Sequence, residues 1–445
     1  MGRWISSLIV FVIALAPLCA QNPPAYSGEI VVKLKKGSTQ FGPDQLAPLA
    51  IDAKVRPVRK VARDARTSSP SVLDGILKFR IAPGHNIRQV CDSLARLEGV
   101  LYAEPLFRES LLHQPDDPYA ARGGQQSYLA LIKAYEAWDV TKGSKEIVLG
   151  IIDTGADLEH QDLKGKFLVT RDSLNGLDDD GNGVTDDHMG YDFANNDPYP
   201  QADYDPHGTR VSGIAGAMTH NALGIAGVGY HTTLSALKIF TSESNESMGA
   251  YDAILYAADN GYDVINLSWG STGSYSPYAQ DVITYAVREK DVVVVAAAGN
   301  SSIDEAFYPA AYDDVLSVAA TNSDDTKASF STFHQSVDLV APGSAIFTTT
   351  NGQSYTTGTG TSFAAPMVAG TAALVRARFP SLNARQVMER IRVTTDDISL
   401  LAANKTFEGK LGKGRLNAFR AVSDEQLISV RPQLVSVSGP FPEGL

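Results

Sequence analysis

Two kinds of hydrophobic pattern alternate along residues 128–422. Short continuous apolar runs occupy residues 147–152, 264–267 and 292–298. Apolar residues at helical spacing occupy 251–259, 278–290, 363–378 and 384–392. Continuous runs are typical of strands buried on both faces, and the helices between them cover both faces of a parallel sheet. The pattern predicts an α/β fold with a mostly parallel sheet between helical layers, and a functional site at the carboxyl ends of its strands.

The pattern before residue 113 differs and predicts a small α+β domain over residues 21–113. Residues 29–34 and 76–81 alternate apolar and polar positions as strands do, and 100–105 is typical of a further strand. Val90, Leu94 and Leu97 have the spacing of one helix face. The segment 113–127 is polar and rich in Pro and Gly, which predicts a linker into the main domain at 114–422.

The two ends of the chain are predicted to lie outside these domains. Arg3 followed by an apolar stretch over residues 4–18 predicts a signal peptide, 1–20, cut after Ala20, and hence a secreted protein. A lipid anchor on Cys19 and a buried helix are alternatives that fit less well. No other segment is apolar enough to cross a membrane, so we expect no stable membrane insertion once the signal is removed. Residues 423–445 are predicted to be a tail or the stub of a further module.

Composition and charge narrow the classes of protein. The chain has 445 residues, 44% of them hydrophobic, and a net charge of -12, which argues against a general nucleic-acid binder. Residues 1–115 hold 15 basic and 9 acidic residues, and the remainder holds 23 and 41, so a basic part precedes an acidic one and the two are expected to dock. Cys91 would be the one cysteine left after the signal peptide is removed, so no disulfide within the exported chain is possible. We therefore expect a bound metal to stabilise the exported protein instead.

Three short segments carry residues suited to nucleophilic catalysis. Gly150–Gly155 places Asp153 at the end of an apolar run, His207–Gly213 opens a segment of small and apolar residues, and Gly358–Gly370 places Ser362 at the start of a helix. Pro366 is expected to fit in the first turn of that helix, where its missing N–H costs nothing. A serine hydroxyl needs an adjacent base, and the base needs an orienting carboxylate, so these segments predict an Asp–His–Ser triad.

The predicted roles follow from the chemistry of acyl transfer. Ser362 attacks a carbonyl carbon, His207 takes the hydroxyl proton and later returns it to the leaving group, and Asp153 fixes the imidazole tautomer. The developing oxyanion needs donors, which the backbone N–H of Ser362 and the side-chain amide of Asn300, after the apolar run 292–298, can supply.

These segments, their order and the Ala297–Asn300 segment between them resemble the subtilisin-type (subtilase) serine proteases. The resemblance covers residues 116–422, and residues 25–110 resemble, more weakly, the inhibitory pro-segment of that family. It implies the subtilisin-like three-layer α/β fold and serine endopeptidase activity. Arg210 and Ser212 depart from the family, which often has His and Ala there; neither belongs to the triad.

The resemblance also implies a substrate groove. Ser268, Trp269 and Gly270 resemble the edge segment that pairs with substrate backbone, and with Ala298 and Gly299 they would wall the pocket for the P1 residue, which precedes the cut. Phe307 stands where the archetype has a glycine at the pocket floor, which predicts a preference for small or medium apolar P1 residues. Strict preference for basic residues is not expected, because no acidic residue obviously lines this pocket, with Glu305 as the one exception to consider.

Two calcium sites are predicted. Asp178, Asp180 and Asn182 occupy positions 1, 3 and 5 of an EF-hand-like loop with Gly183 at position 6. Position 12 is Met189 rather than Glu, so Val184 would give its carbonyl and Asp187 or Asp186 would close the shell. The register stays open, since Asp179 could replace a neighbour, and a solvated acidic loop is the alternative.

The second calcium site rests on the resemblance alone. Asp162 and Asn221 would give side-chain oxygens, and Leu223 and Ile225 would give carbonyl oxygens, although one extra residue lies between His207 and this loop.

Together these features predict a secreted, calcium-stabilised serine endopeptidase made as a zymogen. We expect a monomer that acts on polypeptides and binds its own pro-segment, with no organic cofactor and no nucleic-acid partner. An esterase of the α/β-hydrolase fold is less consistent, because Ala364 replaces the second Gly of G-x-S-x-G and the triad order differs. A calcium-dependent binding module and an inactive homologue are the remaining alternatives.

Overall fold

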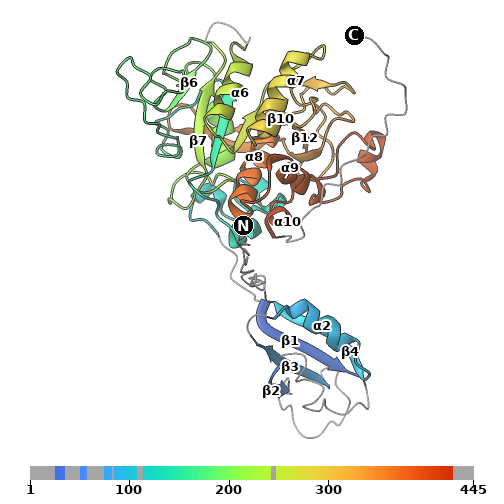
Figure 1. The fold of residues 1–445 in the computed structure, drawn as a ribbon. Coiled ribbons are helices and arrows are strands. Elements are labelled where there is room, and N and C mark those ends of the chain that lie inside the picture. The colour runs from blue at the N-terminus through green and yellow to red at the C-terminus, as the bar shows by residue number, and fades with distance from the viewer. Residues whose placement is uncertain are drawn as a thin grey trace, which may run out of the picture. The chain divides into compact units, whose positions relative to one another are not determined.

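The computed structural model describes residues 26–35, 51–57, 75–82, 85–107, 114–241 and 247–423 (Figure 1). The predicted signal peptide, residues 108–113, which include the first residue of the predicted linker, and residues 424–445 of the predicted tail lie outside the described residues. The chain divides into two compact units, Met1–Leu111 and Leu112–Leu445. No helix within the described ranges is long and apolar enough for a membrane span.

Within the described residues, the first unit contains a four-stranded antiparallel sheet and a helix. The strands are β1 (Tyr26–Leu34), β2 (Ile51–Pro57), β3 (Ile76–Ile81) and β4 (Val100–Phe107), in the order β2-β3-β1-β4. Helix α2 (Ile87–Ala95) begins at Asn86, whose side chain accepts two backbone N–H bonds. Val90 and Leu94 are buried, as the helical spacing predicted, and Cys91 is buried beside them as a free thiol.

The second unit is built on a seven-stranded sheet. Its strands are β5 (Val148–Asp153), β6 (Gly190–Asp192), β7 (Thr233–Lys238), β8 (Val264–Leu267), β10 (Val293–Ala297), β12 (Leu316–Thr321) and β13 (Leu339–Pro342). The order is β13-β12-β10-β8-β5-β7-β6, and all six pairs are parallel. Strands β5, β8 and β10 coincide with the apolar runs read from the sequence. Strand β7 was not predicted, because Thr233, Ser235 and Lys238 interrupt its apolar residues.

Helices pack against this sheet in two groups. In the chain, α5 (His207–Gly216) lies between β6 and β7, α6 (Ala250–Asp259) between β7 and β8, and α7 (Pro277–Thr284) between β8 and β10. Helices α5 and α6 both contact β5, yet α6 packs against α7, whereas α5 packs against α8 (Thr361–Arg378).

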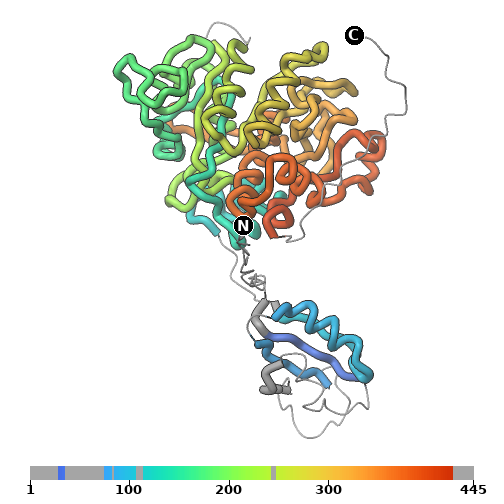
Figure 2. The backbone as a smooth tube through the Cα atoms, viewed as in Figure 1, coloured from blue at the N-terminus to red at the C-terminus, as the bar shows by residue number. Residues whose placement is uncertain are grey.

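The remaining elements complete the second unit. They include α3 (Tyr128–Leu131), α4 (Ala134–Val140), α9 (Ala384–Val393), α10 (Ala418–Ser423) and two antiparallel strand pairs, β9 (Ser271–Thr272) with β11 (Phe307–Tyr308) and β14 (Ile346–Thr350) with β15 (Ser354–Gly358). Figure 2 traces this backbone from the linker to α10. The segment predicted as a linker is partly built into the unit, because Asp117 and Gln126 are buried there.

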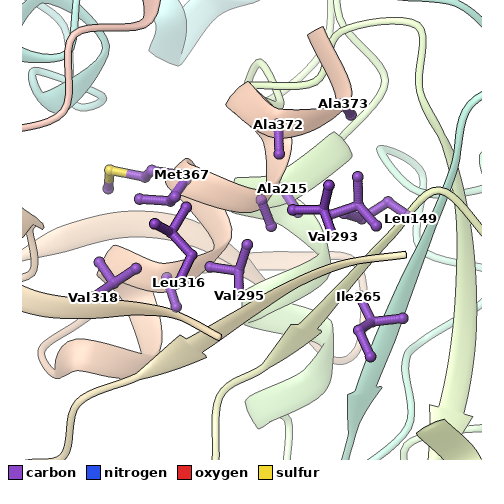
Figure 3. Close-up of a cluster of buried hydrophobic side chains, with 14 of the residues drawn as sticks. Leu149, Ala215, Ile265, Val293, Val295, Leu316, Val318, Met367, Ala372 and Ala373 are labelled. Carbon is purple, nitrogen blue, oxygen red and sulfur yellow. The ribbon is translucent and has the colours of Figure 1, made fainter. Parts of the chain in front are cut away.

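Helix α8 lies at the centre of the core. Residues from Thr361 to Arg376 are buried, so the helix is covered all round and has no polar face. Figure 3 shows Met367, Ala372 and Ala373 of α8 against side chains of the sheet, with Ala215 of α5 beside them. The small residues allow α5 and α8 to approach closely, which fixes both helices relative to the strand ends.

Candidate active site

The predicted catalytic residues lie where strands end and helices begin. Asp153 is the last residue of β5, and His207 is the first residue of α5. Ser362 is the second residue of α8, and Asn300 follows β10. Strand β5 lies inside the sheet, with β7 on one side of it and β8 on the other. Ligands of open α/β sheets bind outside the carboxyl ends of the strands.

Asp153 and His207 form a hydrogen-bonded pair. The Nδ1 atom of His207 lies 2.7 Å from Oδ1 of Asp153, which is buried at 1% exposure. Burial by itself lowers the pKa of His207, but the charge and hydrogen bond of Asp153, with help from Asp205, outweigh burial, and the pKa ends above its ordinary value. The imidazolium form is therefore stabilised, as a general base requires once it has taken a proton.

The turn after Asp153 positions the imidazole. Oδ1 of Asp205 accepts the backbone N–H of His207 at 2.9 Å, and Oγ1 of Thr154 accepts the N–H of Gly208 at 2.9 Å. A Cβ on Gly208 would lie 2.0 Å from the carbonyl oxygen of Gly155, so only glycine allows the helix to begin this close to the strand end.

The Ser362 side chain is buried against the end of β8. Its hydroxyl donates to the carbonyl of Ser268 at 3.1 Å, and the Ser268 hydroxyl donates to the carbonyl of Ser362 at 3.0 Å. The expectation that Pro366 lies in the first turn was wrong, because Pro366 is the sixth residue of α8.

Asn300 is held through its side-chain oxygen. Its Oδ1 accepts both the backbone N–H and the hydroxyl of Thr361, at 2.9 and 3.0 Å. These two bonds fix the amide plane and direct Nδ2 away from Thr361. A Cβ on Gly360 would lie 3.4 Å from this Nδ2, so the bare Cα of Gly360 keeps the space beside the donor open.

Phe307 lies across the predicted pocket walls. A Cβ on Gly299 would meet its ring at 2.7 to 2.9 Å, and a Cβ on Gly270 would meet it at 2.6 Å. The ring therefore packs directly on both bare Cα atoms. The indole N–H of Trp269 donates to the carbonyl of Ile152 at 3.0 Å, which holds Trp269 beside the end of β5.

Comparisons with known proteins agree on one family. The model of the subtilase family matches residues 144–414 of this chain. The chain is 34% identical to the thermophilic serine proteinase of Bacillus sp. (strain AK1) over 94% of its own length and 96% of that protein. It is 37% identical to thermitase of Thermoactinomyces vulgaris, over 70% of this chain and 99% of that one.

The chain belongs to the subtilase family. It is thus a serine-type endopeptidase with the predicted subtilisin-like α/β fold. A solved protease structure from Pseudoalteromonas arctica aligns with this subtilase at a TM-score of 0.57 and 26% identity, covering 70% of this chain and 99% of that chain. Relatives named extracellular and relatives named intracellular both occur in the family.

The acidic loop of this subtilase brings three carboxylates together. Ligand atoms of Asp172, Asp180 and Asp187 lie within 4.8 Å of one another. Asp180 and Asp187 were predicted, whereas Asp172 was missed because it lies six residues before the EF-hand-like pattern. Asp178 is directed elsewhere: its side chain accepts the backbone N–H groups of three following residues, Gly181, Asn182 and Gly183. Burial, followed by the charge of Asp187, raises the pKa of Asp180.

Residues of the same loop and of helix α6 form hydrogen bonds with this cluster. The amide of Asn182 donates to Asp187 at 2.8 Å, and the Tyr256 hydroxyl of α6 donates to the same carboxylate. Val184, predicted as a carbonyl ligand, is half-buried, and its backbone N–H donates to the Asn182 side chain at 2.9 Å.

The residues predicted for the second calcium site also lie together. Asp162 is fully buried and accepts the Asn221 amide at 3.0 Å and the Ile225 N–H at 2.7 Å, and Leu223 lies on the same loop. Asp117, which was assigned to a linker, accepts the backbone N–H groups of the residues at 220 and 221. Burial, with the charge of Asp162 nearby, raises the pKa of Asp117 to about 6.

Proposed function

We propose that this subtilase is a secreted, monomeric endopeptidase, made as a zymogen and stabilised by calcium, that cleaves polypeptides through Asp153, His207 and Ser362. The observation that carries the proposal is the 2.7 Å pair of the buried Asp153 carboxylate and the His207 imidazole at the end of β5. The ring of Phe363, which follows Ser362 in α8, lies 5.9 Å from the His207 ring, so the segment that carries the serine is near this pair.

The reaction proceeds in two halves. Ser362 attacks the scissile carbonyl while its hydroxyl proton passes to Nε2 of His207, which requires the hydroxyl to leave the Ser268 carbonyl that it contacts in the free enzyme. His207 then protonates the leaving amine, and an acyl-enzyme remains. Water, deprotonated by His207, releases the acyl group. Asp153 holds the Nδ1 proton throughout and stabilises the imidazolium.

The oxyanion is bound by Asn300 and the backbone N–H of Ser362. Because Oδ1 of Asn300 is already engaged by Thr361, its Nδ2 is free to donate to the oxyanion without reorganisation. Donors fixed in advance stabilise the transition state more than the planar substrate.

The substrate lies along the segment Ser268–Gly270. An extended peptide pairs there as an added strand, and its P1 side chain enters between Gly270 and Gly299. Since the Phe307 ring packs on both glycines, the pocket is short, and small or medium apolar P1 residues are preferred.

Calcium binds at two places in this proposal. The loop site consists of Asp172, Asp180 and Asp187, supported by Asn182. The chemistry of the donors fits, because Oδ2 of Asp172 is buried with no hydrogen-bond partner among the described residues. The second site consists of Asp162, Asn221 and the carbonyls of Leu223 and Ile225, with Asp117 adjacent. Bound calcium cross-links these loops and neutralises carboxylates that repel one another.

The first unit acts as the pro-segment. Its support is the family resemblance and the charge contrast, because the chain up to residue 115 is net basic and the remainder is strongly acidic. Refolding of a chain that begins near Gln114, with and without residues 21–113 added in trans, tests this part. Equal refolding rates would contradict a templating role.

Casein hydrolysis tests the activity as a whole. The wild-type enzyme in calcium should hydrolyse casein and bind a fluorophosphonate covalently, and Ser362→Ala should do neither. EDTA should cause activity to fade as the fold loses stability. A folded, processed wild type that is neither active nor labelled would support the inactive homologue or the binding module instead.

A further inference from the structure

A polar side chain interrupts the central strand of the sheet. Strand β8 (Val264–Leu267) is buried at all four positions, and Asn266 has 0% exposure. It lies in register with Ile151 of β5 and Val295 of β10, so it has apolar strand neighbours on both sides. Burying an amide here is unfavourable unless its hydrogen bonds are satisfied.

The amide of Asn266 is only half satisfied. Its Nδ2 donates to Oγ of Ser268 at 2.9 Å, while its Oδ1 is buried with no hydrogen-bond partner in the part of the chain that the structure describes. An unsatisfied buried acceptor destabilises a fold, whereas an apolar residue of similar shape would not. Stability alone therefore does not account for Asn266.

The bond from Asn266 continues to the nucleophile. The Ser268 hydroxyl has one proton, and because Asn266 donates to its oxygen, that proton is directed to the carbonyl of Ser362, 3.0 Å away. The three residues thus form a directed series, from the Asn266 amide through the Ser268 hydroxyl to the Ser362 main chain.

Helix α8 explains why the Ser362 carbonyl needs this donor. In a helix that carbonyl would accept the N–H four residues ahead, and the residue there is Pro366, which has none. The carbonyl is buried with Ser362, so it requires a partner from outside the helix. Ser268 supplies it.

We infer that Asn266 is a positioning residue for Ser362: it orients the Ser268 hydroxyl, which replaces the helical hydrogen bond that Pro366 cannot make and so fixes the backbone that carries the nucleophile. The inference rests on the proposed role of Ser362. It assigns the polar residue in β8 to the geometry of catalysis and not to substrate binding.

The main test is Asn266→Leu, a nearly isosteric apolar replacement, in enzyme purified from the full chain with calcium. We expect the thermal midpoint to stay or rise, because the orphaned acceptor is removed. We expect kcat and the rate of fluorophosphonate labelling to fall by about tenfold, as for loss of one buried hydrogen bond to the reacting residue, with KM changed by no more than about twofold.

Two further variants separate positioning from packing. Ser268→Ala interrupts the same series, so Asn266→Leu with Ser268→Ala should be no slower than Ser268→Ala alone, within about twofold. Ser317→Ala is the matched control, because Ser317 is also buried in the sheet, in β12, and its Oγ has no hydrogen-bond partner among the residues described. It should leave kcat unchanged, and its effects should simply add to those of Ser268→Ala.

The outcomes are distinguishable. If the fluorophosphonate labels the wild type and kcat and the labelling rate of Asn266→Leu equal those of the wild type, only the positioning role is overturned. Additive effects of Asn266→Leu and Ser268→Ala on kcat would overturn it as well. A wild type that is not labelled at Ser362 would overturn the proposed function and this inference with it. If Asn266→Leu does not fold, Asn266→Ala in the same cycle decides the question.

Discussion

Replacing Phe307 with glycine should change which residue the enzyme accepts before the scissile bond. The ring packs on the bare Cα atoms of Gly270 and Gly299, at the two walls of the proposed pocket. Strand β11, which carries Phe307, is held by β9 through Thr272 and Ser271, and Tyr308 can keep that pairing without the ring. The substitution therefore opens the pocket while leaving its walls in place.

The magnitude follows from the surface that a P1 side chain could then bury. Full burial of an aromatic or large aliphatic side chain contributes about 1.5–3 kcal/mol. Each tenfold in kcat/KM corresponds to about 1.4 kcal/mol. For a P1 phenylalanine that occupies the vacated space, the ratio of kcat/KM for phenylalanine over alanine should therefore rise by roughly 10- to 150-fold in Phe307→Gly.

Chromogenic peptides that differ only at P1, carrying alanine, leucine or phenylalanine, measure this ratio directly. The wild type should cleave the alanine and leucine peptides fastest. Phe307→Leu is the intermediate control, since it shortens the side chain without exposing both glycines. An unchanged phenylalanine-to-alanine ratio in a Phe307→Gly enzyme that still cleaves the alanine peptide would refute the assignment of Phe307 to the pocket floor.

Three other predictions concern pH, metal and stability. Because the pKa of His207 is raised, kcat/KM should fall on acidification with a midpoint above pH 6.5. Asp153→Asn should lower kcat by about 10⁴-fold and move that midpoint to lower pH. A midpoint that does not move would show that Asp153 is not what raises the pKa of His207. Calcium at 100 times its Kd should add about 2.7 kcal/mol to the free energy of unfolding of the wild type. Asp172→Asn should reduce this gain, whereas Asp178→Asn should not. Equal gains in the wild type and both variants would show that Asp172 does not bind the calcium. Burial lowers the pKa of Lys166 to about 7, so between pH 7 and pH 10.5 the unfolded chain binds a proton at Lys166 that the folded chain does not. The free energy of unfolding should therefore rise with pH in this range by up to ~1.4 kcal/mol per pH unit. Urea unfolding of the Ser362→Ala variant should show this rise, and adding Lys166→Met should abolish it.

The fold was predictable wherever strands are continuous apolar runs. Strands β5, β8 and β10 lie towards the centre of the sheet, where both faces are buried and apolar residues predominate. Strands β6 and β13, at the edges, are short and were not predicted. Strand β7 was missed for a different reason: Lys238 is buried at its end, paired with Asp192 at 2.8 Å and Asp203 at 2.5 Å, and such a pairing between distant residues leaves no local pattern.

The candidate site divides in the same way. The triad segments and Asn300 were predicted because each combines a reactive residue with the local turn or helix start that exposes it. Asp172 and Asp117 were missed because their roles come from residues that fold back on them, eight to more than a hundred positions away. The EF-hand-like spacing predicted a cluster that includes Asp178, whereas the structure groups Asp172 with Asp180 and Asp187 and directs Asp178 to backbone N–H groups.

The sequence by itself determined the central strands and several of the helices, the separation of a basic first part from an acidic second part, and the chemical identity of the proposed nucleophile, base and carboxylate. These are local properties, since periodicity, charge and side-chain type belong to short segments. Only the tertiary structure decided which groups face one another: that Phe307 covers Gly270 and Gly299, that Asp172 joins Asp187, and that Asn266 reaches Ser362 through Ser268. Such contacts depend on strand order and helix packing, which join segments far apart in the chain, so no single segment encodes them.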